Sequence, residues 1–192
     1  MCRGIAVCVQ RRMVPRSDLC TRTRFDSQVP VPIPLEDYLG RFPAYTHFSP
    51  TTYLSSYVLM EKLVSQMEVA LTEFNAHRIM AISLNLAMKM QEDVCIPTAS
   101  FAKLAGISTT EARKLEAQAL RALELNCSIA PSAVHEFCGV LANLFPAGPV
   151  VSYLEQVEEI IHPTRSGSKL LHGDSPTETP STTSGGLWTG RF

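Results

Sequence analysis

Apolar positions follow a helical repeat through the middle of the chain, and the repeat is missing from both ends. In residues 75–91 they lie almost all round the predicted helix, which is typical of a helix enclosed by others at the centre of a domain. Lys89, near its end, is the exception. Because an unpaired buried ammonium is costly, Lys89 should reach the rim of the domain or find a carboxylate, and Glu116 is a natural candidate.

Two helices are predicted before this central one. Residues 35–45 carry an apolar stripe at i, i+3, i+4 and i+7 spacing. Ser49 and Pro50 form a start signal for a helix over residues 49–66, with serine as the N-cap and proline in the first turn. The alternating prolines of residues 30–34 predict an extended entry into this region.

Two more helices are predicted after the central one. A short helix over residues 98–105 is closed by Gly106, whose missing side chain suits a left-handed cap. Ser108 and Glu111 form a capping box at the start of the fifth helix. The predicted fold class is therefore all-α, with five helices in residues 30–130.

The two ends of the chain read differently. Residues 1–29 hold six arginines against two aspartates, and we expect a disordered basic arm. The alternative is a mitochondrial transit peptide, which the aspartates and the missing amphipathic stripe disfavour. Weaker helical patterns at 132–144 and 152–161 predict one or two extra helices within residues 131–162. Residues 163–192 are rich in Ser, Thr, Gly and Pro and should be disordered.

Length and charge limit the kinds of partner. At 192 residues the chain has room for one domain with flanking segments. Residues 30–162 carry eight lysines and arginines against fourteen acids, so they offer little of the basic surface that nucleic acid requires. The early apolar run at residues 5–9 is far too short to span a bilayer. We expect a protein partner, no nucleic acid and no membrane.

The sequence contains no evident catalytic or metal-binding constellation. Its six cysteines form no C-x-x-C pair, so free thiols in a reducing compartment, the cytoplasm or the nucleus, are the simplest interpretation. His77 has no carboxylate, cysteine or second histidine at ligand spacing. A thiol enzyme could use His135 and Cys138, but their i, i+3 spacing is more simply one face of a helix. We expect no metal, no cofactor and no enzymatic activity.

Short motifs occur in a fixed order along the five predicted helices. They are Tyr38-Leu39-Gly40-Arg41, Glu61-Lys62, Asn75 with His77-Arg78, Ala87 and Lys89 followed by Glu92-Asp93, Phe101-Ala102-Lys103, Gly106-Ile107-Ser108 and Leu115-Glu116. In order and spacing this set resembles the cyclin box, and specifically the single-box P-type or U-type cyclins, which include the phosphate-signalling cyclins. Glu61-Lys62 is a departure, since that family has an aspartate followed by arginine there. The resemblance covers about residues 33–129.

The resemblance implies a kinase-binding site formed by the end of the central helix and by the fifth helix. Lys89 and Glu116 would face the mobile kinase helix whose glutamate completes the catalytic ion pair. The neighbouring apolar contacts would be Met90, Leu120 and Leu125. A salt bridge within the chain is the structural alternative, and both can hold, because a prepaired couple at the rim would be preorganised for a partner.

Other positions are assigned structural or regulatory roles. By resemblance, Arg41 and Glu61 form a buried structural ion pair that holds the first helix against the second. Losing one partner of such a pair costs about 3 to 5 kcal/mol. Ser175 and Thr179 each precede a proline, so they fit the preference of proline-directed kinases and are possible phosphorylation sites.

The function implied is that of a cyclin, the regulatory and activating subunit of a Ser/Thr cyclin-dependent kinase, monomeric before it binds the kinase. The chain after residue 125 leaves no room for a second box, and the substrate-docking motif Met-Arg-Ala-Ile-Leu is missing. Two alternatives stay open. One is a nucleic-acid-binding protein of the transcription factor IIB type, which normally needs two repeats and a basic face. The other is a helical adaptor that binds no kinase.

Overall fold

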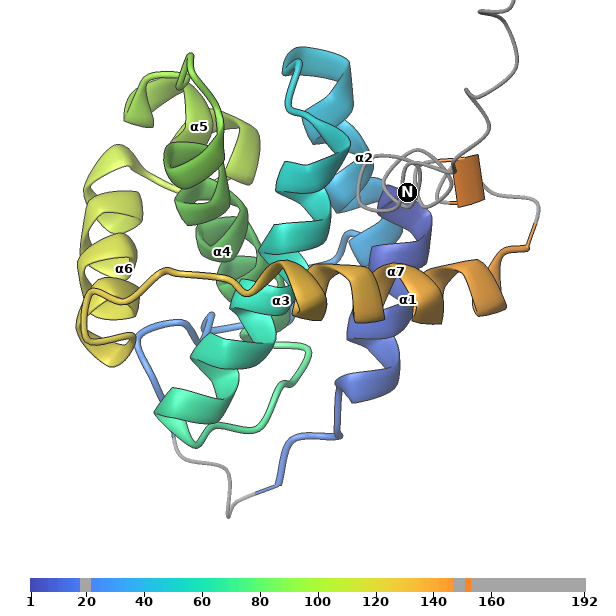
Figure 1. The fold of residues 1–192 in the computed structure, drawn as a ribbon. Coiled ribbons are helices and arrows are strands. Elements are labelled where there is room, and N and C mark those ends of the chain that lie inside the picture. Colours follow the sequence, from blue (N-terminus) through green and yellow to red (C-terminus); the bar gives the residue numbers. More distant parts are fainter. Residues whose placement is uncertain (18–21, 147–150, 153–192) are drawn as a thin grey trace, which may run out of the picture.

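The computed structural model describes residues 1–17, 22–146 and 151–152, and within these residues it has seven α-helices and no strand (Figure 1). The helices are α1 (Cys2–Arg12), α2 (Leu35–Tyr45), α3 (Pro50–Met67), α4 (Ala76–Gln91), α5 (Thr98–Ala105), α6 (Thr109–Ala122) and α7 (Pro131–Leu144). The all-α class predicted from the sequence is confirmed. Six of the helices surround α4 or pack on those that do.

The helix α4 is the centre of the domain. Every residue from Ile79 to Met88 is buried, as the apolar pattern predicted, and α3, α5 and α6 pack against it. The neighbouring helices α3 and α5 begin and end at the capping residues that the sequence predicts. The Oγ of Ser49 accepts the N–H of Thr52 at 3.3 Å at the start of α3, and Gly106 closes α5 in the left-handed region at φ +69°.

The disordered arm expected over residues 1–29 is wrong for the part of this segment that the structure describes. Residues 2–12 form α1, which packs on α2 and buries Ile5 and Val9. The repeat was hidden because glycine, alanine and cysteine fill most of the buried face. Arg11 and Arg12 end the helix, where cations favour the helix dipole. Much of the basic character of this segment therefore belongs to a packed helix.

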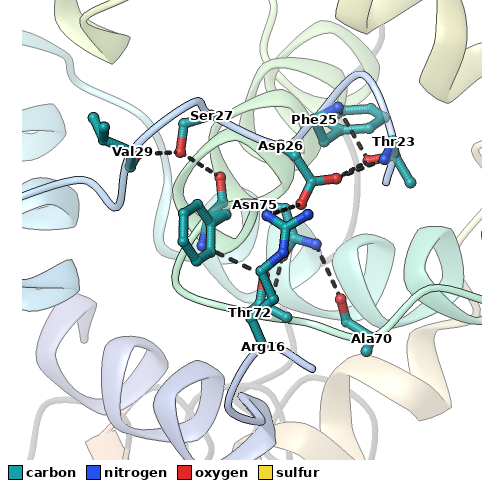
Figure 2. Close-up of polar contacts among 10 residues, drawn as sticks. Arg16, Thr23, Phe25, Asp26, Ser27, Val29, Ala70, Thr72 and Asn75 are labelled. Atoms are coloured by element: carbon teal, nitrogen blue, oxygen red, sulfur yellow. Dashed lines mark hydrogen bonds and ion pairs between the residues drawn. The ribbon is translucent and has the colours of Figure 1, made fainter. Parts of the chain in front are cut away.

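Residues 22–29, called the strap from here on, also pack against the domain (Figure 2). Phe25 is fully buried in the core. The backbone N–H of Ser27 and its Oγ both donate to the carbonyl of Phe74, each at 2.8 Å. Arg16 lies 4.6 Å over the Phe74 ring and pairs with Asp26 at 3.7 Å. The strap is therefore attached to the segment that leads into α4.

The helix α7 matches the helix predicted over residues 132–144 and crosses α1 and α3 (Figure 1). The rings of Tyr57 on α3 and Phe137 on α7 stack with centroids 3.9 Å apart. A Cβ at Gly4 would lie 3.0 Å from the Cδ2 of Leu141, so glycine allows α1 and α7 to approach this closely. The second predicted helix, over residues 152–161, lies outside the described residues from residue 153 onward, as does the tail over residues 163–192.

Candidate functional site

The C-terminal end of α4 and the middle of α6 meet at an ion pair between Lys89 and Glu116. The Nζ of Lys89 donates to the Oε1 of Glu116, while the Nδ2 of Asn85, one helical turn before Lys89, donates to Oε2 at 3.1 Å. The side chains of Lys89 and Glu116 are 34% and 15% exposed. The pairing predicted from the sequence is therefore confirmed, and it lies at the rim of the domain.

Asn85 is a site residue that the sequence reasoning missed. It is only 1% exposed, and its Oδ1 has no hydrogen-bond partner among the described residues. A buried amide is kept in a helix core only where it has a specific partner, and here that partner is Glu116. The available signal was a single asparagine inside an apolar run, four residues before Lys89, a spacing that places the two side chains on one face.

The apolar residues assigned to the site are not equivalent. Met90 and Leu125 are 59% and 76% exposed, so each presents a large apolar side chain to solvent, and Met90 follows Lys89 directly in the chain. Leu120 is partly buried and packs against the core. Leu125 also has a left-handed backbone, with φ +60°, and its N–H donates to the carbonyl of Leu120 at 2.8 Å. A left-handed leucine costs about 1 to 2 kcal/mol, so the turn after α6 is strained.

The structural ion pair expected between Arg41 and Glu61 is not formed, and this prediction is wrong. Glu61 accepts two hydrogen bonds from Arg12 of α1, at 3.0 and 3.1 Å, and one from the phenol of Tyr57 at 2.9 Å. Arg41 instead lies 5.7 Å over the ring of Tyr38. The physical reason is α1, which the sequence did not predict and which brings a closer guanidinium to Glu61.

The contacts of Glu61 also affect the groups around it. Burial and the hydrogen bond to Glu61 raise the pKa of Tyr57, so its phenol stays protonated and donates. The hydrogen bond to Glu61 and its negative charge raise the pKa of Arg12. The guanidinium of Arg12 on α1 and the phenol of Tyr57 on α3 therefore donate hydrogen bonds to the same carboxylate, which joins α1 to α3.

His77 and Arg78, at the start of α4, make contacts inside the domain. The Nε2 of His77 lies 2.8 Å from the carbonyl of Ile33, and its ring meets the Tyr38 ring edge-on at 5.0 Å. Burial lowers the pKa of His77, so the neutral ring donates from Nε2 to that carbonyl. Arg78 pairs with Glu111 of α6 at 2.9 Å. These residues position α4 and leave His77 buried.

Residues 1–17, 22–146 and 151–152 contain no group of three His, Cys, Asp or Glu side chains placed to hold a metal ion. Within the same residues, no helix combines the length and the apolar character needed to cross a bilayer. The predicted phosphorylation sites Ser175 and Thr179 lie outside the described residues.

Comparison with known proteins identifies the class to which this fold belongs. The family model for cyclins matches residues 8–126, which is more than half of the chain. The chain therefore belongs to the cyclin family, and its fold is an all-α cyclin fold. Cyclins are regulatory proteins, and no catalytic family is indicated. The match begins within α1, whereas the sequence analysis placed the start of the box at residue 30.

The relatives are P-type and U-type cyclins of plants, as the motifs predicted. The chain is 30% identical to Cyclin-P4-1 of Oryza sativa subsp. japonica over 125 residues, which are 65% of this chain and 56% of the relative. It is 27% identical to Cyclin-U3-1 of Arabidopsis thaliana over 116 residues, 60% of the chain and 52% of the relative. It is 28% identical to Cyclin-U2-2 of Arabidopsis thaliana over 134 residues, 68% and 57%. The matches span little more than half the length of these relatives.

Proposed function

We propose that this chain is the regulatory and activating subunit of a Ser/Thr cyclin-dependent kinase. Family membership supports a regulatory role of this kind. The observation that carries the proposal is the Lys89 and Glu116 pair, which is partly exposed, held by Asn85, and accompanied by the exposed side chains of Met90 and Leu125. Exposed apolar side chains combined with a few charged hydrogen-bonding groups are typical of a protein-protein interface.

The pair is suited to hold a kinase helix by hydrogen bonds. Lys89 has three N–H donors, and one of them reaches Glu116. Glu116 accepts one bond on each carboxylate oxygen, and each oxygen has a second lone pair for a partner. Because Asn85 already fixes the carboxylate, little side-chain entropy is lost when a partner binds. The arrangement offers both donors and acceptors to one segment.

The proposed mechanism acts on the position of the kinase helix. In a protein kinase, a glutamate of that helix must pair with the lysine that contacts the ATP phosphates, and the metal-binding aspartate must also be in place. Contacts from Lys89 and Glu116, with Met90 and Leu125 against apolar kinase side chains, would favour the inward position of the helix. The cyclin shifts the kinase between two states and takes no part in phosphoryl transfer itself.

The direct experiment is reconstitution with a panel of cyclin-dependent kinases. The full chain should bind at least one kinase in a pull-down and raise its activity toward a peptide substrate, while the chain alone transfers no phosphate from ATP. Size-exclusion chromatography should give a monomer before the kinase is added. If every kinase of the panel stays unbound and inactive, the chain is a cyclin-fold adaptor without a kinase, and the proposal fails.

A further inference from the structure

A positively charged groove lies along α6, the helix that also carries Glu116, and Glu116 is not among its lining residues. Its volume is about 320 Å³. The lining residues are Arg24, Thr110, Arg113, Lys114, Ala117 and Arg121. All except Arg24 come from α6, and Arg24 comes from the strap that follows residue 21, so two segments far apart in sequence meet here.

The groove has four cations and no acid in its lining. Among the described residues, none of these four side chains has an ion pair or a hydrogen-bond partner, whereas Arg3, Arg12, Arg16, Arg78 and Lys89 are each paired with a carboxylate. The contrast is sharper because residues 30–162 hold eight basic side chains against fourteen acids. Like charges this close repel one another, so the groove favours a counter-charge from outside the chain.

The cations form one stripe on the outer face of α6. Thr110, Arg113, Ala117 and Arg121 follow one another at spacings of three and four residues, which places them on a single face. Eleven residues of helix span about 16 Å. The buried face of α6, with Ala112, Leu115 and Ala119, packs into the domain. The stripe is therefore free to meet a ligand longer than a single ion.

Arg24 lies in a turn whose neighbouring residues Thr23, Phe25 and Asp26 are joined by hydrogen bonds (Figure 2). The Oδ2 of Asp26 accepts the N–H of Thr23 at 2.6 Å and its hydroxyl at 3.0 Å, and the Oγ1 of Thr23 accepts the N–H of Phe25 at 3.1 Å. The neighbouring Phe25 is fully buried, which anchors the turn in the core. Arg24 is exposed on this fixed backbone and lines the groove together with the α6 residues, so it is in place without a ligand.

We propose that this groove binds a phosphoserine or phosphothreonine in a phosphorylated protein segment. Three guanidinium groups can each give bidentate hydrogen bonds to phosphate oxygens, and Lys114 adds a point charge. The length of the stripe accommodates flanking peptide as well as the phosphate. Nucleic acid is disfavoured, because a long polyanion would extend beyond the groove. There it would be repelled by the net negative charge of residues 30–162.

The inference deepens the proposed function and rests on it for its biological meaning. A kinase subunit with such a groove would select substrates or partners that already carry a phosphate. None of the groove residues belongs to the Lys89 and Glu116 site. Binding to the groove can therefore be measured with the cyclin chain alone, so its failure can be told apart from a failure to bind a kinase.

The test uses the full chain and a degenerate peptide library with a fixed phosphothreonine-proline, measured by fluorescence anisotropy. The controls are the same library with unmodified threonine, inorganic phosphate as a competitor, and a labelled DNA duplex. We expect the phosphorylated library to bind at least about tenfold more tightly than the unmodified one. The double substitution Arg113→Glu with Arg121→Glu should abolish this difference. The control Lys103→Glu, on the exposed side of α5, has the same charge change as the single variant Arg24→Glu and should change the affinity by less than about twofold.

Each outcome bears on the proposal. Arg24→Glu, on a separate segment, should also lower the affinity for the phosphorylated library. This variant keeps the test valid if circular dichroism shows that the double variant of α6 is unfolded. Equal binding of the two libraries would overturn the proposal. It would also be overturned if inorganic phosphate bound as tightly as the phosphorylated library, which would indicate a small-anion site. Tighter binding of the DNA duplex than of the phosphorylated library would overturn it as well.

Discussion

Two ion pairs join helices in this domain, one between α4 and α6 and one between α1 and α3. Both pair a cation with a glutamate, but they differ in how many hydrogen-bond donors and acceptors remain without a partner among the described residues. Glu116 takes one hydrogen bond on each carboxylate oxygen, from Lys89 and from Asn85. Glu61 takes three hydrogen bonds, two of them from the guanidinium of Arg12. Lys89 keeps two N–H donors that no described residue accepts, whereas the fork of Arg12 is aligned with its carboxylate.

The difference teaches what each pair can do. A carboxylate filled by a bidentate guanidinium and a phenol has little left for a partner, so the α1–α3 pair serves to join two helices. The α4–α6 pair combines spare donors and acceptors with the exposed side chain of Met90, the residue after Lys89, which suits a surface that binds a second protein. The following predictions test this division, from the largest expected effect to the smallest.

The largest effect should come from the strap, because it is held by a core side chain and not by a charge. Phe25 is fully buried, and Phe25→Ala should lower the free energy of unfolding by about 3 to 5 kcal/mol. Urea denaturation followed by circular dichroism measures this. Arg24→Ala, next to it and exposed, is the matched control and should stay within about 0.5 kcal/mol. Equal, small effects would mean that residues 22–29 do not belong to the folded domain.

A smaller effect should identify the partner of Glu61. Double-mutant cycles between Arg12 and Glu61 should give a coupling energy of about 0.5 to 1 kcal/mol, since the pair is partly exposed and screened by solvent. The cycle between Arg41 and Glu61 should give a coupling near zero. A coupling confined to Arg41 and Glu61 would restore the pairing expected from the family and would contradict the contact with α1.

The smallest effect concerns pH. Burial lowers the pKa of His77 in the folded state below its ordinary value near 6.5, so protonation disfavours folding. The stabilisation from the neutral ring is fully present above pH 6.5 and is lost as the pH falls toward the folded pKa. Thermal melts from pH 7.5 to 5 should show this loss, and His77→Gln, which can still donate to the carbonyl of Ile33, should reduce the slope. An unchanged slope would mean that His77 is hydrated and protonated in the folded state.

Much of the fold and half of the site were accessible from the sequence. The helices from residue 35 to residue 144 are predicted by apolar repeats, a Ser-Pro N-terminal signal and a glycine C-cap, all of which are local signals. Lys89 and Glu116 were paired correctly because both lie on such helices and because a charge in an apolar helix requires a partner. Local rules were sufficient here since the motifs and the packing agree.

The rest depended on contacts that local rules do not encode. The helix α1 buries alanine, glycine and cysteine beside Ile5 and Val9, so its apolar face is weak in any hydropathy pattern and becomes stable only against α2 and α7. Without α1, Arg12 could not be placed, and Glu61 was given the family's partner, Arg41. Arg24 was likewise counted as part of a flexible arm, because the turn that aims it at α6 is fixed by the burial of Phe25.

The central claim is that Lys89 and Glu116 bind a kinase and do not merely hold α4 against α6. It is tested most directly by the dissociation constant of the cyclin and kinase complex for Glu116→Ala and Lys89→Ala, with Asp37→Ala on α2 as the exposed control. We predict that each substitution at the pair weakens binding by about 2 to 5 kcal/mol, roughly 30-fold to several thousandfold, and destabilises the free chain less than Phe25→Ala does. If both variants bind like Asp37→Ala but unfold as readily as Phe25→Ala, the pair is structural and the kinase binds elsewhere.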